Sequence, residues 1–180
     1  MQHIGTQTIE TERLILRRFK IEDAQDMFEN YANSEKVAEF VKWNAHKNVE
    51  ETEEYLQNCV LPKYENPDNY CWAVVLKELG QVIGCIDVVG MDEKYLRAEL
   101  GWVLGEKFWG KGYMPEAGKA VLKLLFDLGF VRVQAKHHLG NPKSGRVMEK
   151  LGMTYEGILK KYDHDKEGNL IDLKFWAITK

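Results

Sequence analysis

Hydrophobic and polar positions divide the first part of the chain into one strand and two helices. The apolar content of 12–19 predicts an opening strand, and apolar residues recur at helical spacing over 21–31, which predicts a helix. A second helix is expected over 49–61. Acidic residues at its start favour a helix N-terminus, and Pro62 favours its end.

The middle of the chain has the pattern of an antiparallel meander. Strands are expected over 70–76 and 81–89, and the turn 78–81 between them predicts a hairpin. A third strand is expected over 97–104.

The last third predicts a helix, a strand, a helix and a hairpin. The first helix begins at Pro115, carries apolar residues at helical spacing and ends at Gly129. The other elements are expected at 130–136, at 141–152, and at 153–161 with 170–178 around the polar turn 163–169. This order predicts one mixed α+β domain over residues 1–180, built around one sheet.

Composition narrows the class of protein. The 180 residues are 44% hydrophobic and 29% charged, which excludes a disordered chain and a fibre. No apolar run approaches the length of a membrane span, and the N-terminus lacks the regions of a signal peptide. Three cysteines, an odd number without paired spacing, predict reduced thiols packed in the core of a cytoplasmic protein: Cys59, Cys71 and Cys85. We expect no membrane partner.

Charge is unevenly distributed around a net value of −3. Residues 104–180 hold 14 Lys and Arg against 9 Asp and Glu, whereas residues 1–103 hold 11 against 19. A basic second half suits an anionic ligand and an acidic first half suits a cationic substrate, although scattered solvated charge explains the pattern equally well. No clear basic face is evident, so no nucleic-acid partner is expected.

The segment 98–117 reads as a strand, a glycine-containing turn and the start of a helix, which is a typical seat for a phosphate. Gly110 and Gly112 leave the backbone uncrowded just before the helix. A dinucleotide fingerprint would need a third glycine where Pro115 stands, and a triphosphate loop would need Ser or Thr in place of Gly112. Both common loops are therefore excluded.

Three segments together resemble the GNAT superfamily of N-acyltransferases. Lys107-x-x-Gly110-x-Gly112 resembles the acyl-CoA loop Gln/Arg-x-x-Gly-x-Gly/Ala, with Lys in the first position. Asn141-x-x-Ser144, followed by Glu-Lys-Leu-Gly-Met, resembles the superfamily's second motif. The opening Glu12-Arg-Leu-Ile-Leu-Arg is similar to the ribosomal-protein N-terminal acetyltransferase branch, of RimJ/RimL type. The resemblance covers nearly the whole chain.

The resemblance implies a mostly antiparallel sheet, flanked by helices, that opens between the strand ending at Leu104 and the strand 130–136. The pantetheine arm of acetyl-CoA would fill this opening and pair with the backbone of Trp102, Val103 and Leu104. Asn141 would hydrogen-bond the pantetheine from the other side. The implied fold is that of the acyl-CoA N-acyltransferases.

The same resemblance implies where the phosphates bind. The pyrophosphate would lie on backbone N–H groups of the turn 107–113, and Lys143 and Arg146 are candidates for the 3′-phosphate, against a plain solvated helix face. The turn residues expected to bind acetyl-CoA are Lys107, Gly110, Lys111, Gly112 and Tyr113. Acetyl-CoA is the expected co-substrate, and no metal is expected.

For chemistry, the resemblance implies direct attack of an amine on the thioester without a covalent enzyme intermediate. Ser144 is the candidate donor to the departing thiolate, because the tyrosine that many members carry four residues later is Met148 here. Its alternative role is to cap the helix. Glu99 is the candidate base; its alternatives are attraction of a cationic substrate or pairing with Arg97, with water as the base. The backbone N–H of Val103 is the expected oxyanion donor.

Other polar residues receive structural interpretations. Glu116 is expected to be a helix-start carboxylate. Adjacent His137 and His138 would face opposite ways on a strand, and the segment 163–165 reads as a polar hairpin tip rather than a metal site. Four aromatic residues suit either an acceptor pocket or the core: Trp43, Tyr64, Tyr70 and Trp72.

The leading functional hypothesis is acetyl transfer to a primary amine, the N-terminus of a protein as in the resembled branch. The alternatives are a small amine such as a polyamine, an amino acid or an aminoglycoside, and a non-catalytic acyl-CoA sensor. A serine hydrolase is disfavoured because the chain has no Gly-x-Ser-x-Gly elbow. A homodimer is possible, but the sequence marks no interface.

Overall fold

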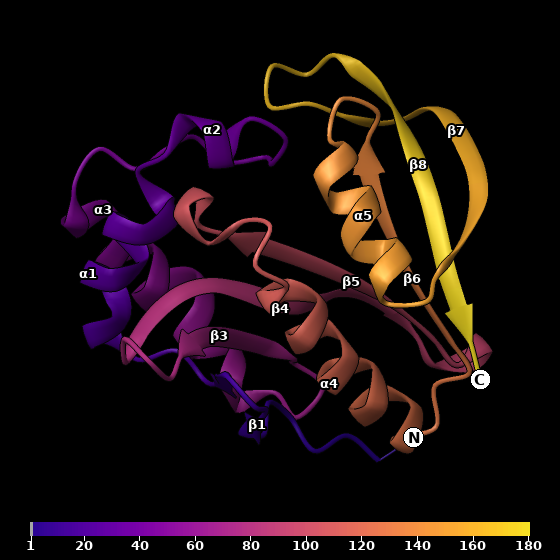
Figure 1. Cartoon of the computed structure of the whole chain (residues 1–180), viewed down its shortest axis with the longest axis horizontal. Helices are drawn as coiled ribbons and strands as arrows, with labels where there is room; N and C mark the ends of the chain where they lie inside the picture. Colours follow the sequence, from indigo (N-terminus) through magenta and orange to yellow (C-terminus); the bar gives the residue numbers. More distant parts are fainter. Residues whose placement is uncertain (1) are drawn as a thin grey trace.

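A computed structural model describes residues 2–180, and within them eight strands form one sheet with helices on both faces (Figure 1). The strand order is β1-β2-β3-β4-β5-β6-β8-β7, and every neighbouring pair is antiparallel except β5–β6. The strands are β1 (Ile9–Glu10), β2 (Leu14–Arg17), β3 (Cys71–Leu76), β4 (Gln81–Asp92), β5 (Arg97–Leu104), β6 (Arg132–His138), β7 (Thr154–His164) and β8 (Leu170–Thr179). The predicted α+β class with a single mixed, mostly antiparallel sheet is confirmed.

In the described range 2–180, five segments are α-helical: α1 (Ala24–Met27), α2 (Glu35–Ala38), α3 (Val49–Tyr55), α4 (Tyr113–Asp127) and α5 (Pro142–Lys150). The predicted helix 21–31 is a composite, because a 3-10 turn (Ile21–Asp23) precedes α1 and a π-helical turn (Phe28–Ala32) follows it. α2 was not predicted. It has only four residues, and the Ser34 side chain that caps it is its sole local signal.

Two predicted helix boundaries were wrong. Helical turns continue past Pro62 to Glu65, because Pro62 stands in the first turn of a 3-10 helix (Leu61–Glu65), where its missing N–H leaves no hydrogen bond unmade. The helix α4 begins at Tyr113, two residues before Pro115, directly after Gly112. Pro115 lies in the first turn, where proline is tolerated for the same reason.

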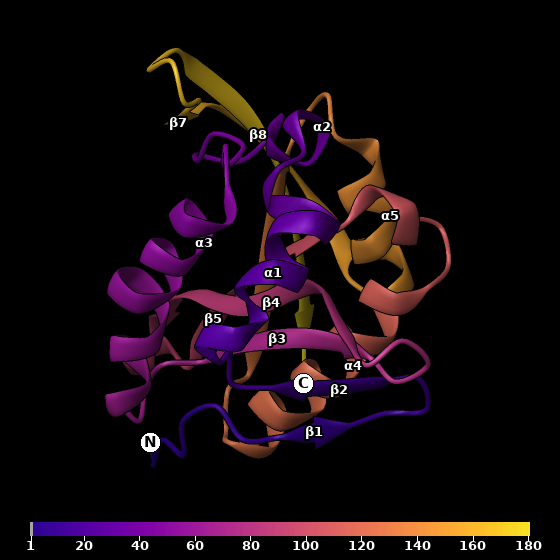
Figure 2. The same cartoon turned by 90° about the vertical axis from the view of Figure 1, so that its left-hand side faces the viewer.

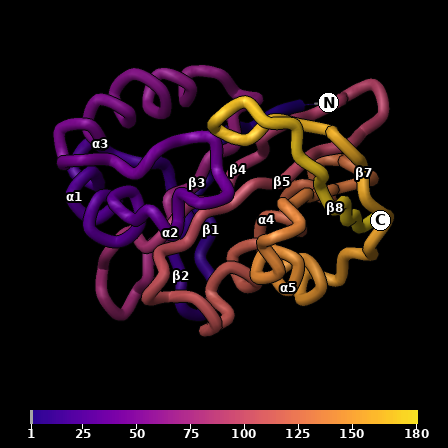
Figure 3. Tube along the Cα trace, turned by 90° about the horizontal axis from the view of Figure 1, so that it is seen from above, coloured from indigo at the N-terminus to yellow at the C-terminus, as the bar shows by residue number. Residues whose placement is uncertain are grey.

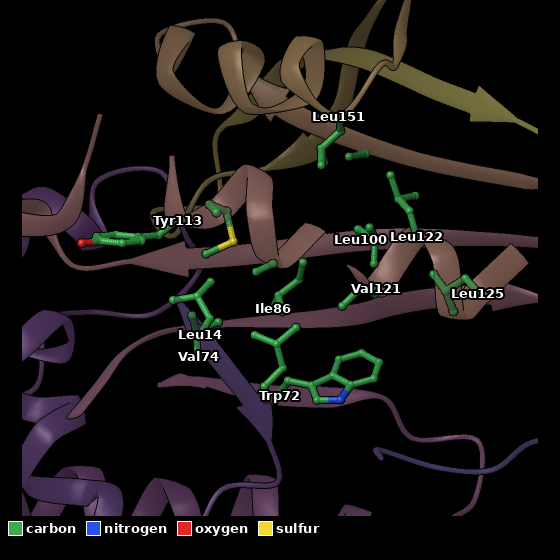
Figure 4. Close-up of a cluster of buried hydrophobic side chains, with 14 of the residues drawn as sticks. Leu14, Trp72, Val74, Ile86, Leu100, Tyr113, Val121, Leu122, Leu125 and Leu151 are labelled. Carbon is green, nitrogen blue, oxygen red and sulfur yellow. The ribbon is translucent and has the colours of Figure 1, made fainter. Parts of the chain in front are cut away.

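Two hydrophobic clusters hold helices to opposite faces of the sheet. Alternation along β3 sends Trp72, Val74 and Leu76 to one cluster and Ala73 and Val75 to the other. The first cluster lies under α4 and α5 (Figure 4), and the second lies under α1 and α3 (Figure 2). Viewed from above, the two pairs of helices are separated by the sheet (Figure 3).

The aromatic and cysteine side chains can now be placed. Tyr70 and Trp72 are core residues, 1% and 0% exposed, whereas Trp43 borders a small cavity described below. Tyr64 packs on the second cluster; its hydroxyl donates to the Cys71 carbonyl and accepts from the Phe19 N–H. Cys71 and Cys85 pack on the same cluster, as expected. The prediction for Cys59 was wrong: it is exposed, since it lies on the outer side of the helical segment after α3.

The sheet opens where the sequence resemblance implied. β5 and β6 pair only at 97–99 with 132–134, whereas β6 stays paired with β8 along its whole length. The remaining residues of β5 diverge from β6 and leave a gap in the middle of the sheet (Figure 1).

The tip of the β7–β8 hairpin reaches across to the segment after α2 (Figures 1 and 3). Lys42 Nζ lies 2.5 Å from an Asp163 oxygen, and Lys166 Nζ donates to the Ala38 carbonyl at 3.4 Å. No helix within residues 2–180 is long and apolar enough to cross a membrane.

Candidate functional site

A cleft of about 630 Å³ lies where β5 and β6 separate. This volume is in the range of small-molecule and cofactor sites. Most of the residues that the sequence assigned to a ligand line this cleft: Trp102, Val103, Leu104, Gly110, Gly112, Tyr113, Asn141, Lys143, Ser144 and Arg146. Lys107 and Lys111 do not line it; their ammonium groups lie 5.6 Å and 5.9 Å from the centre of the Phe108 ring.

The backbone of β5 presents hydrogen-bonding groups to this gap. The Gly105 N–H donates to the Ile83 carbonyl on β4 at 2.9 Å, and antiparallel alternation therefore turns the amides of Trp102 and Leu104 away from β4. The indole N–H of Trp109 donates to the Leu104 carbonyl at 2.7 Å, which agrees with this orientation. The Val103 N–H, expected to be the oxyanion donor, is instead directed to Cys85 on β4.

The glycine turn and the start of α4 form one end of the cleft. Gly110 and Gly112 have φ values of +78° and +83°, in the left-handed region that favours glycine. No side chain caps α4, because its N-cap residue is Gly112. The first N–H groups of α4 therefore remain available to an anionic group, and the helix dipole favours such a group there.

Arg13 and Glu116 brace this turn, and the role of Arg13 was not predicted. Glu116 accepts from the Thr11 hydroxyl at 2.6 Å, from Arg13 N at 2.8 Å and from Arg13 Nε at 2.7 Å. Arg13 also donates to the Lys111 carbonyl at 3.0 Å and lies 4.6 Å above the Tyr113 ring. Burial opposes ionisation of Glu116, but the Thr11 and Arg13 hydrogen bonds outweigh it and hold its pKa below the usual value.

The helix α5 supplies the opposite wall. Asn141 caps it by accepting from the Ser144 N–H at 3.3 Å, so the cap is Asn141 and not the Ser144 hydroxyl. That hydroxyl has no protein partner in the part of the chain that the structure describes. Lys143 Nζ lies 3.7 Å from the centre of the Trp109 ring, which joins the two walls across the cleft.

Glu99 lies outside the cleft lining and is already neutralised. Lys136 Nζ lies 2.7 Å from one of its oxygens, and Gln134 donates to the other at 2.8 Å. Arg97, its expected partner, pairs with Asp92 at 3.0 Å instead.

A second cavity, of about 50 Å³, lies on the face of the sheet that α1 and α3 cover. It is lined mostly by apolar and aromatic side chains: Phe19, Met27, Tyr31, Trp43, His46, Tyr55, Val60, Cys71, Cys85, Asp87 and Val103. Val103 lines both the cavity and the cleft, so this residue borders the two spaces.

Asp87 is the carboxylate of this cavity, and the sequence analysis did not identify it. Burial raises its pKa to about 6, and Lys63 opposes the shift only weakly. Within residues 2–180 it has no hydrogen bond or ion pair. The only signal in the sequence was a single acid in the otherwise apolar run 82–89.

The remaining polar candidates are structural. His137 is buried and His138 is partly exposed, on opposite faces of β6 as predicted. Asp165 accepts hydrogen bonds from Glu167 N and Asn169 N within the hairpin turn. Among the described residues, 2–180, no group of three or more His, Cys, Asp or Glu side chains could hold a metal ion.

Comparison with known proteins adds four findings. The sequence profile of the family described as "Acetyltransferase (GNAT) domain" matches residues 13–154. The uncharacterized N-acetyltransferase p20 of Bacillus licheniformis is 32% identical over 97% of each chain. The crystal structure of a GNAT-family acetyltransferase from Bacillus anthracis is 28% identical, with a TM-score of 0.82 over 96% of this chain and 98% of that one. The fold is also shared with the ribosomal-protein-S5-alanine acetyltransferase of Vibrio fischeri, at 22% identity and a TM-score of 0.79 over 96% of each chain.

Proposed function

The chain belongs to the GNAT family of acetyl-CoA-dependent N-acetyltransferases, and from this premise we propose that it acetylates the N-terminal amine of a protein. The observation that carries the proposal is the gap between β5 and β6, which forms a cleft of about 630 Å³ with a glycine turn and an uncapped helix start at one end, and which shares Val103 with a second, small cavity. The acceptor class is supported by the fold shared with a ribosomal-protein-S5-alanine acetyltransferase.

The lining of the cleft fits acetyl-CoA. Two glycines with positive φ and an uncapped helix start suit a pyrophosphate, and the amides of Trp102 and Leu104 suit the amide-containing pantetheine arm. Lys143 and Arg146, on α5, are positioned for the 3′-phosphate. Lys107 and Lys111 lie outside the lining, so we assign them only a long-range attraction.

Acetyl-CoA supplies a thioester carbonyl, and the enzyme's own groups manage the charge. The amine nitrogen forms the C–N bond as the C–S bond breaks, and the electron pair leaves with sulfur. We assign the proton that neutralises the sulfur to the Ser144 hydroxyl, which water reprotonates. We assign stabilisation of the oxyanion to an amide of Trp102 or Leu104, because these face the gap.

A small amine is the second candidate acceptor, favoured by the small volume of the inner cavity and by the acidic first half of the chain. A folded protein and a small amine both satisfy a narrow amine site, because only the end of a protein chain needs to enter it.

The test is release of free CoA from acetyl-CoA, measured with a panel of acceptors. The panel contains peptides with a free N-terminus, the same peptides with a blocked N-terminus and an internal lysine, polyamines and aminoglycosides. Release of CoA with the free peptides alone supports the proposal. Release with small amines alone would assign a small amine as the acceptor in place of a protein N-terminus. Tight binding of acetyl-CoA without release in any case would contradict it and indicate an acyl-CoA sensor.

A further inference from the structure

Two polar groups in the small cavity are left without partners in the described part of the chain. One is the Asp87 carboxylate on β4, which has no hydrogen bond or ion pair. The other is the hydroxyl of Tyr31, a side chain only 1% exposed whose oxygen has no hydrogen-bond partner. Buried polar groups are nearly always satisfied, so the orphaned Tyr31 hydroxyl, together with the unpaired and partly buried Asp87 carboxylate in the same lining, indicates a missing ligand.

The surroundings indicate which ligand these groups suit. Trp43, His46 and Tyr55 bring aromatic rings to the same cavity, and aromatic faces attract cations. A carboxylate accepts hydrogen bonds and a tyrosine hydroxyl both donates and accepts. A primary ammonium carries three donors and one positive charge, and it complements this set.

The backbone keeps the cavity open at Asp87. Asp87 pairs with Gly101 across β4 and β5, and a Cβ at Gly101 would lie 3.1 Å from Asp87 Oδ1 and 2.7 Å from Val89 Cγ1. Because residue 101 is glycine, no side chain there crowds the Asp87 carboxylate. Tyr31 stands in the π-helical turn that follows α1, and such turns often occur at functional sites.

We propose that this cavity is the amine subsite of the enzyme, where Asp87 and Tyr31 bind the primary amine of the acceptor and Asp87 takes a proton from it. The proposal rests on the acetyl-transfer function proposed above. The cavity volume of about 50 Å³ accommodates a few water molecules. The cavity therefore admits an amine whose neighbouring carbon carries a small substituent and rejects an amine whose neighbouring carbon is α,α-branched.

The nitrogen loses two protons during the reaction, and each has its own destination. The ammonium gives its first proton to Asp87, which releases it to solvent, and the neutral nitrogen attacks the carbonyl beside Val103. The second proton leaves nitrogen as the amide forms and is balanced by protonation of the departing sulfur. The products are the acetylated amine, free CoA and one proton.

The central experiment compares Asp87→Asn with wild type. We expect kcat/KM for the amine to fall by on the order of 10²- to 10⁴-fold, which is typical for loss of a general base, while the Kd of acetyl-CoA stays unchanged. Tyr31→Phe should raise the KM of the amine more than it lowers kcat. Asp127→Asn, at the exposed end of α4 far from both cavities, is the matched control and should leave activity unchanged.

Glu99→Gln tests the rival carboxylate and should cost less than Asp87→Asn, because Glu99 is paired with Lys136. A loss below threefold in Asp87→Asn, or a larger loss in Glu99→Gln, would overturn the assignment of Asp87. A substrate series gives a second measure: amines with an α,α-branched carbon should react at least 10-fold more slowly than unbranched ones.

Failure of the subsite can be separated from failure of the transfer function. Ethylamine is titrated into the enzyme without acetyl-CoA, and NMR shifts of the Asp87 and Tyr31 amides are followed in wild type and Asp87→Asn. Shifts that depend on Asp87 support the subsite even if no acceptor is acetylated. Shifts that persist in Asp87→Asn, or no shifts at all, would overturn it even if wild type is active.

Discussion

The cleft and the small cavity share Val103 in their linings, but they are built in different ways. The cleft takes its binding groups from backbone amides and from two short segments, 102–113 and 141–146. The cavity takes single side chains from α1, from the turns after it, from the α3 region and from three strands. A site built from backbone amides tolerates most side-chain substitutions but requires particular backbone φ angles. A site built from side chains is sensitive to substitution of each of its residues.

The largest expected effect on acetyl-CoA affinity concerns the cleft alone. Gly112→Asp places a side chain at φ +83° and a negative charge at the phosphate seat, so acetyl-CoA affinity should fall by roughly 100-fold or more, about 3 kcal/mol. Calorimetric titration of acetyl-CoA measures it.

Gly168→Asp is the control for this variant. It has the same charge change at φ +86°, but it lies in the hairpin tip with nothing near its Cβ. It should lose stability without losing acetyl-CoA affinity. An equal loss of affinity in both variants would reject the phosphate seat.

The next effect concerns the small cavity, where the substitution is expected to increase stability. The folded state raises the pKa of Asp87 from 3.8 to about 6, so it binds the proton more tightly than the unfolded chain does. Stability therefore falls as pH rises through this window, and the ionised group costs about 3 kcal/mol at neutral pH. Asp87→Asn should raise the free energy of unfolding at pH 7.5 by up to that amount, and by much less at pH 4.5. Urea denaturation at both pH values checks this, and an equal effect at both would contradict it.

Activity should show the same titration. If Asp87 is the base, kcat/KM rises with pH through an apparent pKa near 6. Burial raises the pKa of Tyr31, Tyr55 and both half-buried cysteines away from this window, whereas it lowers the pKa of His46 below its usual value. His46→Gln separates the last group, and a limb that disappears in His46→Gln instead of Asp87→Asn would assign it to the histidine.

A smaller effect tests the brace behind the cleft. Arg13→Ala removes the contacts to Glu116, the Lys111 carbonyl and Tyr113, and should weaken acetyl-CoA binding about 10-fold, roughly 1.4 kcal/mol. Because the pKa of Glu116 is lowered on folding, the stability from this pair is present above the usual carboxyl pKa and is lost as pH falls. Arg132→Ala, which breaks a comparable pair with Glu156, should leave donor affinity intact.

The last expected effect concerns Ser144 and is confined to turnover. Ser144→Ala should lower kcat by about 10-fold while acetyl-CoA affinity and stability are unchanged, because the α5 cap is Asn141. Single-turnover kinetics would measure it, and unchanged turnover would remove Ser144 from the mechanism.

The same contrast explains what the sequence could predict. β5 has the predicted bounds 97–104, and the gap beside it was implied by the resemblance of the motifs at 107–112 and 141–144 to the GNAT superfamily. Lys107 and Lys111 lie outside the cleft lining, with their ammonium groups near the Phe108 ring, and no local rule in the sequence gives the placement of such flexible side chains. Arg13 was missed because its partners Lys111 and Glu116 come close only through the fold.

The cavity was beyond a local prediction. Asp87 in an apolar strand has no motif, and its isolation is visible only once Tyr31 and Val103 are packed around it. Conversely, Glu99 had the expected strand position but was neutralised by Lys136, which lies on a different strand.

The contact between the hairpin tip and the segment after α2 connects the two sides of the split sheet. It is made by Lys42, in the segment after α2, and Asp163, on β7, an exposed ion pair worth only about 0.2–1 kcal/mol. Loss of this pair therefore costs little free energy, so the ion pair by itself holds the hairpin tip only weakly against the segment after α2.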